Sequence, residues 1–373
     1  MEPKVSCVNH AALVNDYYMK HLCLREDSLQ IASTAFIRPY SAKRSMETSI
    51  AAARRQQKRH VAAQRRAQRL EQLITQGKFV PLRDQVRGAL QDTFDRYGGP
   101  HFKLHVFLPS FRGTDSAETA STLEDMLNLL SKASKEKVLD DGSIHFNATN
   151  YLQVAVVNNT KIILPAGSSF AQRDVRELRQ ISLEKFKLIV MDPPWQNKSV
   201  LRGKQYGMFD HTDLLAIDIP HIADVDECVL AVWVTNRPRY MTYLRDQVLP
   251  FWGFTFHACW YWLKLSKNGE LVTPLDLTHR LPVETLVVAY RAKDHKHEQL
   301  LRQRLGEQMR VVFSIPLRHS WKPPPECFIS NDIISTSDKK VELFARELRP
   351  YWTSVGNEQV FKFQNAYMFQ PML

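Results

Sequence analysis

Residues Leu188-Ile189-Val190-Met191-Asp192-Pro193-Pro194-Trp195 are the most informative stretch of this sequence. A largely apolar run that begins at Phe186 and stops at Asp-Pro-Pro predicts a buried strand that ends in a tight turn. Ligands of open α/β sheets bind outside the carboxyl ends of the strands. The stretch therefore predicts an α/β fold in which a carboxylate, two rigid prolines and a flat aromatic ring lie where a ligand would bind.

The residues from Asp192 to Trp195 suit chemistry on an exocyclic base amine such as adenine N6. The lone pair of this amine is delocalised into the ring, so a protein must accept hydrogen bonds from both N–H groups before the nitrogen can attack an electrophile. The Asp192 carboxylate is one acceptor, and the Pro193 carbonyl, held rigid with Pro194, is the second. Trp195 offers a ring on which the base can stack, worth about 1–3 kcal/mol. Taken alone, the tetrapeptide could equally be a turn with Trp195 covering the core.

The composition fits a protein with a sizeable core and an anionic partner. The 373 residues are 44% hydrophobic and carry a formal net charge of +11, which favours nucleic acid over a membrane as the partner. No apolar run is long enough for a transmembrane helix, and the first residues do not resemble a secretory signal. Five scattered cysteines without a C-x-x-C pair predict neither a zinc site nor a disulfide framework, and no metal site is expected.

The positive charge is concentrated between Lys43 and Arg69, where nine Lys and Arg residues stand against one acid. Residues 46–76 predict one long helix that ends at Gly77. At about 100° per residue, four cationic side chains fall within an arc of about 60°: Arg54, Lys58, Arg65 and Arg69. We expect this face to contact nucleic-acid phosphates; the alternative is a solvated charged helix.

Three segments are expected along the chain. Residues 1–78 form an N-terminal segment with the basic helix, residues 79–150 form a small α/β segment, and residues 151–373 form the main domain. The small segment is expected to contain a strand over Lys103–Leu108 and a helix over about 122–137. In the main domain, alternating strands and helical stretches predict a doubly wound, mostly parallel sheet, with a helix over Glu298–Gln308. Its expected strands are Leu152–Val157, Lys161–Leu164, Phe186–Met191, Val229–Thr235, Phe254–Leu263, Thr285–Tyr290, Val311–Ser314, Lys340–Phe344 and Val360–Phe363.

An ordered series of motifs follows in residues 160–373. The series is Leu188–Trp195, Tyr206-Gly207-Met208, Val232–Thr235, Trp260–Lys264, Glu284–Ala289, His319–Pro323, Val341–Arg346 and Trp352–Glu358. It resembles the eukaryotic N6-adenine methyltransferases that carry a DPPW motif and use S-adenosylmethionine. Gln196-Asn197-Lys198 behind the tetrapeptide, and the segment Leu164–Phe170, resemble most the branch called methyltransferase-like protein four.

The resemblance implies a Rossmann-like methyltransferase fold with a permuted motif order, in which the catalytic residues Asp192–Trp195 precede the cofactor strand Val341–Arg346. It implies that Lys322 binds the cofactor carboxylate and that Arg346 lies near the cofactor adenosine. Tyr206 and Glu284 are expected at the target nucleotide. The other residues that it places at the cofactor are Ser169, Phe170, Asp192, Phe344, Asn357 and Glu358.

Without the resemblance, several of these residues have plainer readings. Lys322 stands before three prolines, where a lysine is usually solvated, and Glu284 could be an exposed residue at the start of a strand. Trp233, Trp260 and Trp262 lie within apolar strands and are expected in the core rather than as stacking platforms.

The most specific expectation is methylation of adenine N6 in RNA. The branch points to an internal 2′-O-methyladenosine of a small nuclear RNA of the U2 type, which would become N6,2′-O-dimethyladenosine. Adenine in DNA is the close alternative, and a catalytically inactive RNA-binding scaffold is an alternative of another class, because the family also includes inactive partners. We expect a stand-alone monomer in the nucleus, with the cytoplasm as the alternative location, and no membrane partner.

Overall fold

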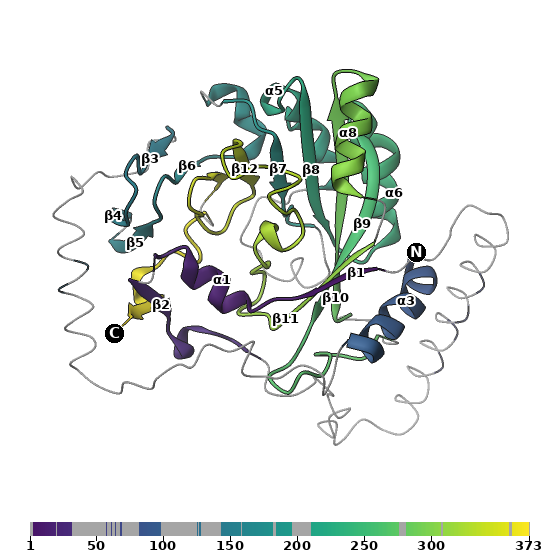
Figure 1. The fold of residues 1–373 in the computed structure, drawn as a ribbon, viewed down its shortest axis with the longest axis horizontal. Helices are drawn as coiled ribbons and strands as arrows, with labels where there is room; N and C mark the ends of the chain where they lie inside the picture. The colour runs from purple at the N-terminus through teal and green to yellow at the C-terminus, as the bar shows by residue number, and fades with distance from the viewer. Residues whose placement is uncertain are drawn as a thin grey trace.

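Ten strands form the central sheet in the computed structural model of the protein (Figure 1). Their order from edge to edge is β1-β11-β9-β10-β8-β7-β12-β13-β6-β3. Neighbours are parallel except where β10 lies antiparallel between β8 and β9 and where β3 pairs with β6. This confirms the predicted α/β fold with a mostly parallel sheet. The strands are β1 (Lys4–Cys7), β3 (His145–Phe146), β6 (Ser169–Gln172), β7 (Leu188–Met191), β8 (Glu227–Val234), β9 (Thr255–Lys264), β10 (Val283–Ala292), β11 (Arg310–Ser314), β12 (Lys340–Leu343) and β13 (Thr353–Gly356).

The structure describes most of the chain in ten stretches and a few single positions. These are residues 3–19, 21–31, 82–97, 143–157, 159–181, 184–195, 210–275, 281–306, 309–357 and 360–372, together with 57, 61, 64, 68, 125 and 127. None of the helices in these ranges has the length and apolar character needed to cross a membrane.

Strand β7 shows how the sheet is buried on both faces. Ile189 and Met191 pack into the core cluster on one face, whereas Leu188 and Val190 pack into the cluster on the other. A strand that is covered on both faces needs apolar residues at every position, so its sequence is a continuous apolar run rather than an alternating one. This is why the run before Asp192 identifies a central strand.

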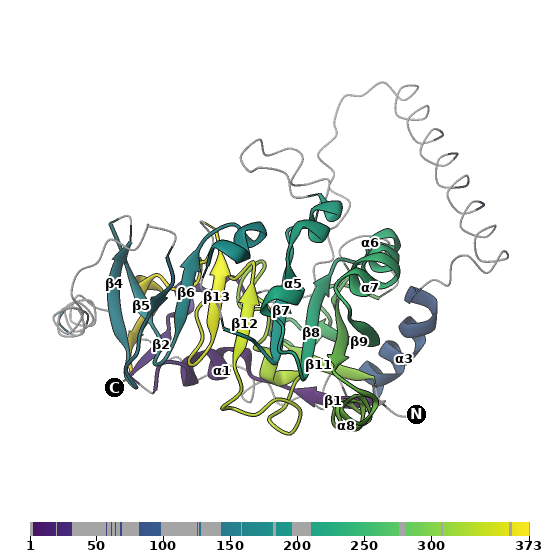
Figure 2. The ribbon, with the colours of Figure 1, turned by 90° about the horizontal axis from the view of Figure 1, so that it is seen from above.

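Helices cover the two faces of the sheet (Figure 2). One cluster contains residues of α5, α6, η7 and α7, and the opposite cluster contains Leu301 and Leu305 of α8. The helical elements are α1 (His10–Asp16), η1 (Glu26–Ser28), α3 (Leu82–Tyr97), η4 (Val175–Gln180), η6 (His211–Ala216), α5 (Ile219–Ile222), α6 (Pro238–Tyr243), η7 (Leu244–Val248), α7 (Leu249–Phe251), α8 (His295–Leu305), η8 (Pro325–Cys327) and η9 (Ala366–Met368).

The N-terminal residues pack onto the main sheet. Strand β1 pairs parallel with β11, and β2 (Leu22–Leu24) pairs antiparallel with β14 (Phe369–Pro371). Between them, α1 contributes to a buried cluster that also contains Trp321 and Phe363. A separate hairpin is formed by β4 (Gln153–Val157) and β5 (Thr160–Leu164). The first residues of the chain are thus in contact with the loop that carries Trp321.

Most of the predicted strands of the main domain are found, with ends that differ by a residue or two. The prediction of a strand over Val360–Phe363 is wrong because the chain turns there, and the Val360 amide donates to the Asn357 carbonyl at 3.0 Å. Val360 and Phe363 are buried in two different clusters. The apolar residues that suggested a strand therefore anchor a turn.

Other elements differ from the expectation or fall outside the described residues. Strands β1, β6 and β13 are four residues long, too short for a clear periodic signal, and α3 was not predicted. The helix predicted over Glu298–Gln308 runs instead from His295 to Leu305, and Gly306 caps it with a φ of 71° that suits glycine. Positions 57, 61, 64 and 68 are helical, as are 125 and 127, in agreement with the two helices predicted there. Arg54, Lys58, Arg65, Arg69 and Lys103–Leu108 lie outside the described residues.

Candidate active site

Asp192 is the first residue after β7, at the carboxyl edge of the parallel part of the sheet. Strand β7 lies between β8 and β12, and both pairs are parallel, so the residues that follow these strands share one edge. Pro193 and Pro194 have no backbone N–H and cannot continue the ladder. The Trp195 amide turns back to the Pro193 carbonyl at 2.8 Å. This turn fixes the Asp192 side chain, 9% exposed, at the edge of the sheet.

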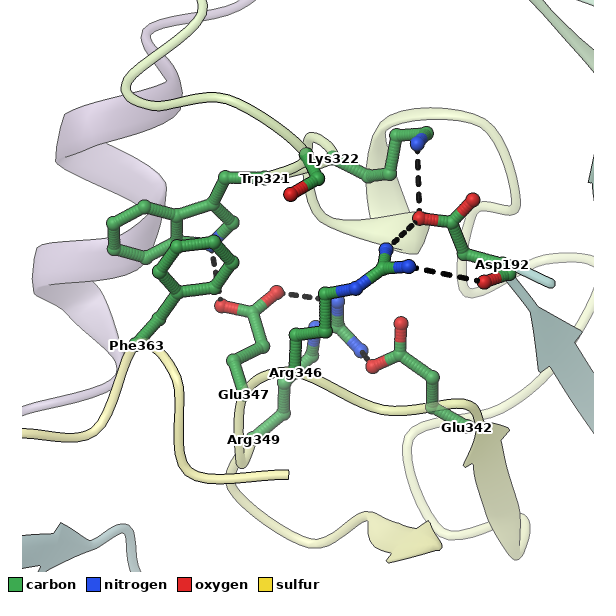
Figure 3. A pocket seen from close by; sticks show the side chains of 9 residues that line it. Asp192, Trp321, Lys322, Glu342, Arg346, Glu347, Arg349 and Phe363 are labelled. Atoms are coloured by element: carbon green, nitrogen blue, oxygen red, sulfur yellow. Dashed lines mark hydrogen bonds and ion pairs between the residues drawn. The ribbon is translucent and has the colours of Figure 1, made fainter. Parts of the chain in front are cut away.

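Two cations converge on the Asp192 carboxylate (Figure 3). Lys322 Nζ lies 2.9 Å from Asp192 Oδ2, and the Arg346 guanidinium donates to the same oxygen. Arg346 Nη2 also lies 3.5 Å from the backbone carbonyl of Asp192. The fold thus brings together three predicted site residues from distant parts of the sequence.

Glu284, on β10, extends this ion-pair network. Its Oε2 lies 3.0 Å from Lys322 Nζ, and its Oε1 accepts a hydrogen bond from Lys264. Burial alone would raise the pKa of Glu284, but the ammonium groups of Lys264 and Lys322 lower it well below its ordinary value. The result is a row of alternating charge formed by Lys264, Glu284, Lys322, Asp192 and Arg346.

The lowered pKa of Glu284 predicts that this part of the fold is sensitive to acid. A carboxyl group whose pKa is lower in the folded state stabilises the fold above its unfolded value, 4.5, and loses that contribution as the pH falls below it. The free energy of unfolding of the wild type should therefore approach that of Glu284→Gln on acidification below about pH 4.5. Urea unfolding of both proteins across this range tests it, and a difference that stays constant or widens contradicts it.

Trp195 is packed into the core rather than open as a stacking platform. It is 8% exposed, its Nε1 donates to the Trp233 carbonyl at 2.7 Å, and its ring centroid lies 5.0 Å from that of Tyr240. The expectation that a base stacks on an open face of Trp195 is not met in this arrangement. The indole instead anchors the turn after Asp192 against the end of β8. Trp233, Trp260 and Trp262 are buried, as predicted.

A second charged network lies beside the first (Figure 3). Arg349, 2% exposed, donates to both Glu342 and Glu347. Glu347 Oε2 also accepts a hydrogen bond from Trp321 Nε1 at 2.8 Å. Burial raises the pKa of Glu347 to about 7, although Arg349 opposes the shift. This network ties the loop between β12 and β13 to the segment that carries Lys322.

Both networks border one small pocket of about 10 Å³, roughly the space of one water molecule. Sites for small molecules usually enclose about 300–1,000 Å³. The Arg346 guanidinium and Lys322 both contact Oδ2 of Asp192 at this pocket, so a ligand larger than a water molecule needs the lining side chains to move. The lining residues are Asp192, Ser320, Trp321, Lys322, Glu342, Arg346, Glu347, Arg349 and Phe363.

The carboxyl ends of β6 and β13 form the neighbouring stretch of this edge. Gln172 ends β6, and its buried Oε1 has no hydrogen-bond partner among the described residues. In the pairing of β6 with β13, Gln172 lies opposite Gly356. The next residue, Asn357, is exposed. A Cβ at Gly356 would lie 2.8 Å from the Ala345 carbonyl, so glycine is needed where the ends of β12 and β13 meet. An orphaned acceptor and an exposed amide beside the Asp192 network fit the nucleoside part of S-adenosylmethionine.

The remaining predicted cofactor residues are placed unequally. Phe344 directly follows β12 with a φ of 57° and packs against the core at this edge. Ser169 lies at the start of β6, away from the carboxyl edge, with Oγ 2.8 Å from Thr353 Oγ1. Phe170 is fully buried in an apolar cluster. Ser169 and Phe170 are therefore not among the residues that line the pocket, and Gln172 on the same strand lies at the carboxyl end of β6, outside that lining.

Tyr206 and Glu358 lie outside the described residues. Sequence reasoning missed Lys264 and the triad Glu342–Arg349–Glu347 as parts of the site. One signal was available, because Glu342 interrupts an apolar strand and a charge at a buried position needs a partner. No group of three or more His, Cys, Asp or Glu side chains is positioned to hold a metal ion in the described part of the chain.

Comparison with known proteins shows which family part of the chain resembles. Residues 186–358 match the MT-A70 family. The matched residues make up less than half of the chain, and the mostly parallel sheet that they contribute to is consistent with a Rossmann-like methyltransferase fold.

The similarity to individual relatives supports a METTL4-like branch. The chain is 34% identical over 230 residues to human N(6)-adenine-specific methyltransferase METTL4. The aligned region covers 60% of this chain and 48% of that protein. The chain is also 34% identical to a Caenorhabditis elegans DNA N6-methyl methyltransferase, over 57% of this chain and 56% of the relative. It is 28% identical to the N6-methyladenosine RNA methyltransferase MTA1 of Pyricularia oryzae, over 75% and 71%. The chain spans about half the length of human METTL4.

Proposed function

We propose that this protein is an S-adenosylmethionine-dependent methyltransferase that acts on adenine N6 in RNA. The observation that carries the proposal is the Asp192 carboxylate, held at the end of β7 beside a Pro193 carbonyl and facing a pocket rather than the core. The names of the relatives, which specify N6 of adenine, point to the same chemistry.

Catalysis would depend on positioning rather than on a strong base. Asp192 accepts a hydrogen bond from one N–H of the amine, and Pro193 offers a carbonyl for the other. This carbonyl already accepts from the Trp195 amide, but a carbonyl oxygen has two lone pairs. The two acceptors favour a tetrahedral nitrogen with its lone pair directed at the electrophile. S-adenosylmethionine, when bound, supplies a methyl group on a sulfonium sulfur.

The chain offers distinct residues for each part of the cofactor. Lys322 would hold the carboxylate, with Gln172 and Asn357 on the side of the nucleoside and Arg346 near the adenosine once it leaves Asp192. Because Lys322 also contacts Asp192 and Glu284, it couples the cofactor side of the site to the substrate side. Glu284 and Tyr206 are proposed to contact the target nucleotide.

The substrate is proposed to be a structured RNA, at an internal 2′-O-methyladenosine of a small nuclear RNA. One relative is named as an RNA methyltransferase and another as a DNA methyltransferase, so DNA is the alternative substrate. In either case the base must be single-stranded or flipped, because N6 is paired in a duplex. Mass spectrometry of nucleosides from RNA and DNA, each incubated with the protein and labelled cofactor, tests the proposal. The proposal would be overturned if neither the RNA nor the DNA yielded nucleosides with a label on adenine N6.

One observation favours the alternative of an inactive RNA-binding scaffold. The Arg346 guanidinium is hydrogen-bonded to the Asp192 carboxylate, and the pocket has room for about one water molecule. An inactive protein would keep this arrangement when offered the cofactor. Isothermal titration calorimetry with S-adenosylmethionine separates the two, because heat of binding requires the pocket to open and its absence supports the scaffold.

The basic helix over residues 46–76 is proposed to bind phosphates without sequence preference. Charge reversal at Arg54, Lys58, Arg65 and Arg69 is expected to weaken RNA binding while cofactor affinity stays unchanged. The slope of log affinity against log salt should also fall, by about 0.7 for each phosphate of a single strand that the variant no longer neutralises. Fluorescence anisotropy at several salt concentrations measures this, and an unchanged RNA affinity would refute the role. We also propose a nuclear location and a monomer.

A further inference from the structure

Two cations beside the pocket-lining segment around Ser320 have no carboxylate partner in the described part of the chain. Arg318 and Lys362 make no ion pair with any described residue. The Arg318 guanidinium has only a weak acceptor among these residues, Met368 Sδ at 3.7 Å from Nη1. Lys362 Nζ instead donates to the hydroxyl of Ser320 at 2.9 Å.

The backbone presents Ser320 to Lys362 in a special conformation. Ser320 has a φ of 64°, a region that non-glycine residues rarely adopt and that is concentrated at functional sites. It lies two residues before Lys322 and lines the same pocket as Asp192. On the other side, the Lys362 ammonium lies 5.4 Å from the ring of Phe363, which stacks on Trp321 with centroids 4.1 Å apart. The stacked rings of Trp321 and Phe363 therefore hold their chain neighbours Ser320 and Lys362 in place.

The charge balance at the rim favours an anion. The two charged networks that border the pocket together contain four cations and four carboxylates, so their formal charges balance. Arg318 and Lys362 add two positive charges that neither network neutralises. Burial lowers the pKa of Lys362, and the nearby guanidinium groups of Arg346 and Arg318 lower it further. An anion bound between these cations would relieve this repulsion.

We propose that Arg318, Ser320 and Lys362 form a phosphate-binding site, which takes a backbone phosphate of the nucleic acid next to the target adenine. A guanidinium, a hydroxyl and an ammonium group are the donors that proteins commonly offer to phosphate oxygens. The phosphate would fix the strand at the rim so that the base enters the pocket toward Asp192.

The cofactor carboxylate is the competing anion. Lys322 lies deeper and contacts Asp192 directly, whereas Lys362 is exposed at the mouth. A phosphate of a nucleic-acid strand that approaches from solvent reaches Lys362 before Lys322, so the observations favour the nucleic acid. The assignment of the phosphate to a target adenine rests on the proposed function, but binding of the strand can be measured without methyl transfer.

A double-mutant cycle, in which the protein and the RNA are altered separately and together, tests this site. The probes are a short single-stranded RNA with one adenosine, and the same RNA with uncharged methylphosphonates flanking that adenosine, both bound in the presence of S-adenosylhomocysteine. The wild type is expected to bind the uncharged probe about two- to fivefold more weakly. Lys362→Met should bind the normal probe more weakly by a similar factor and show no further loss with the uncharged probe. Arg318→Met should behave in the same way.

Lys339→Met is the matched control, because Lys339 precedes β12 at the opposite edge of the sheet and pairs with Glu184. It removes the same charge and should retain the full response to the methylphosphonates. The proposal would be overturned if the losses of RNA affinity from Lys362→Met and from the methylphosphonates were additive. It would also be overturned if Lys339→Met lost as much RNA affinity as Lys362→Met. Weaker S-adenosylmethionine binding with unchanged RNA binding would assign the site to the cofactor carboxylate instead. If the wild type binds both probes as expected but transfers no methyl group, the proposed function fails while the phosphate site stands.

Discussion

Asp192→Asn is expected to lower the rate of methyl transfer by about 10²- to 10³-fold, the effect of removing one preorganised electrostatic contact at a reacting atom. The amide is nearly isosteric with the carboxylate, but it has no negative charge and can direct an N–H group at the amine of the base. Steady-state transfer of labelled methyl groups, with nucleoside mass spectrometry of the product, measures the loss. Turnover at the wild-type rate would contradict the role of Asp192.

The same substitution also has a structural effect that must be separated from the catalytic one. Asp192 neutralises two partly buried cations, and Arg346 has no other carboxylate within ion-pair distance among the described residues. The variant should therefore unfold at a lower urea concentration than the wild type while keeping its fold. Asp226→Asn is a control, because among the residues with described positions its exposed carboxylate pairs only with Lys293 at the surface, and it should change neither stability nor turnover appreciably.

The central part of the fold follows from the sequence because it depends on local signals. The apolar run before Asp192 identifies β7, and the two prolines mark where the strand ends. Short elements such as β1 and β13 could not be predicted, since four residues that mix polar and apolar side chains lack the continuous apolar run that identifies β7. The error at Val360–Phe363 arises because an apolar cluster does not show whether it lines a strand or anchors a turn.

The site was predicted as a set of residues but not as an arrangement. The motifs name Asp192, Lys322, Glu284 and Arg346, and the fold joins all four in one ion-pair network. The sequence does not show which cation pairs with which carboxylate, because these pairs form only when separate strands meet at one edge. The resemblance places Arg346 near the cofactor adenosine, which stays a prediction, and the structure adds that its guanidinium contacts Asp192.

Arg349→Met is expected to cause the largest loss of stability, about 3–5 kcal/mol, because it leaves two buried carboxylates without a cation. Arg349 is the cation that contacts both Glu342 and Glu347, and all three side chains are buried. Urea unfolding followed by circular dichroism measures the loss. A variant that also carries Glu342→Gln and Glu347→Gln should recover much of the stability, since replacing a whole buried ionic group is often close to neutral.

The pH dependence of this loss distinguishes an electrostatic cause from a packing defect. The pKa of Glu347 is raised to about 7, so its protonated form is favoured in the fold, and the stability that this gives is present below the unfolded value of 4.5 and lost as the pH rises through about 7. Without Arg349 the charged form is still less favourable. The deficit of Arg349→Met should therefore be smaller at about pH 5 than at about pH 8. A deficit that is equal at both pH values would mean that poorer packing around the new side chain, rather than the uncompensated carboxylates, accounts for the destabilisation.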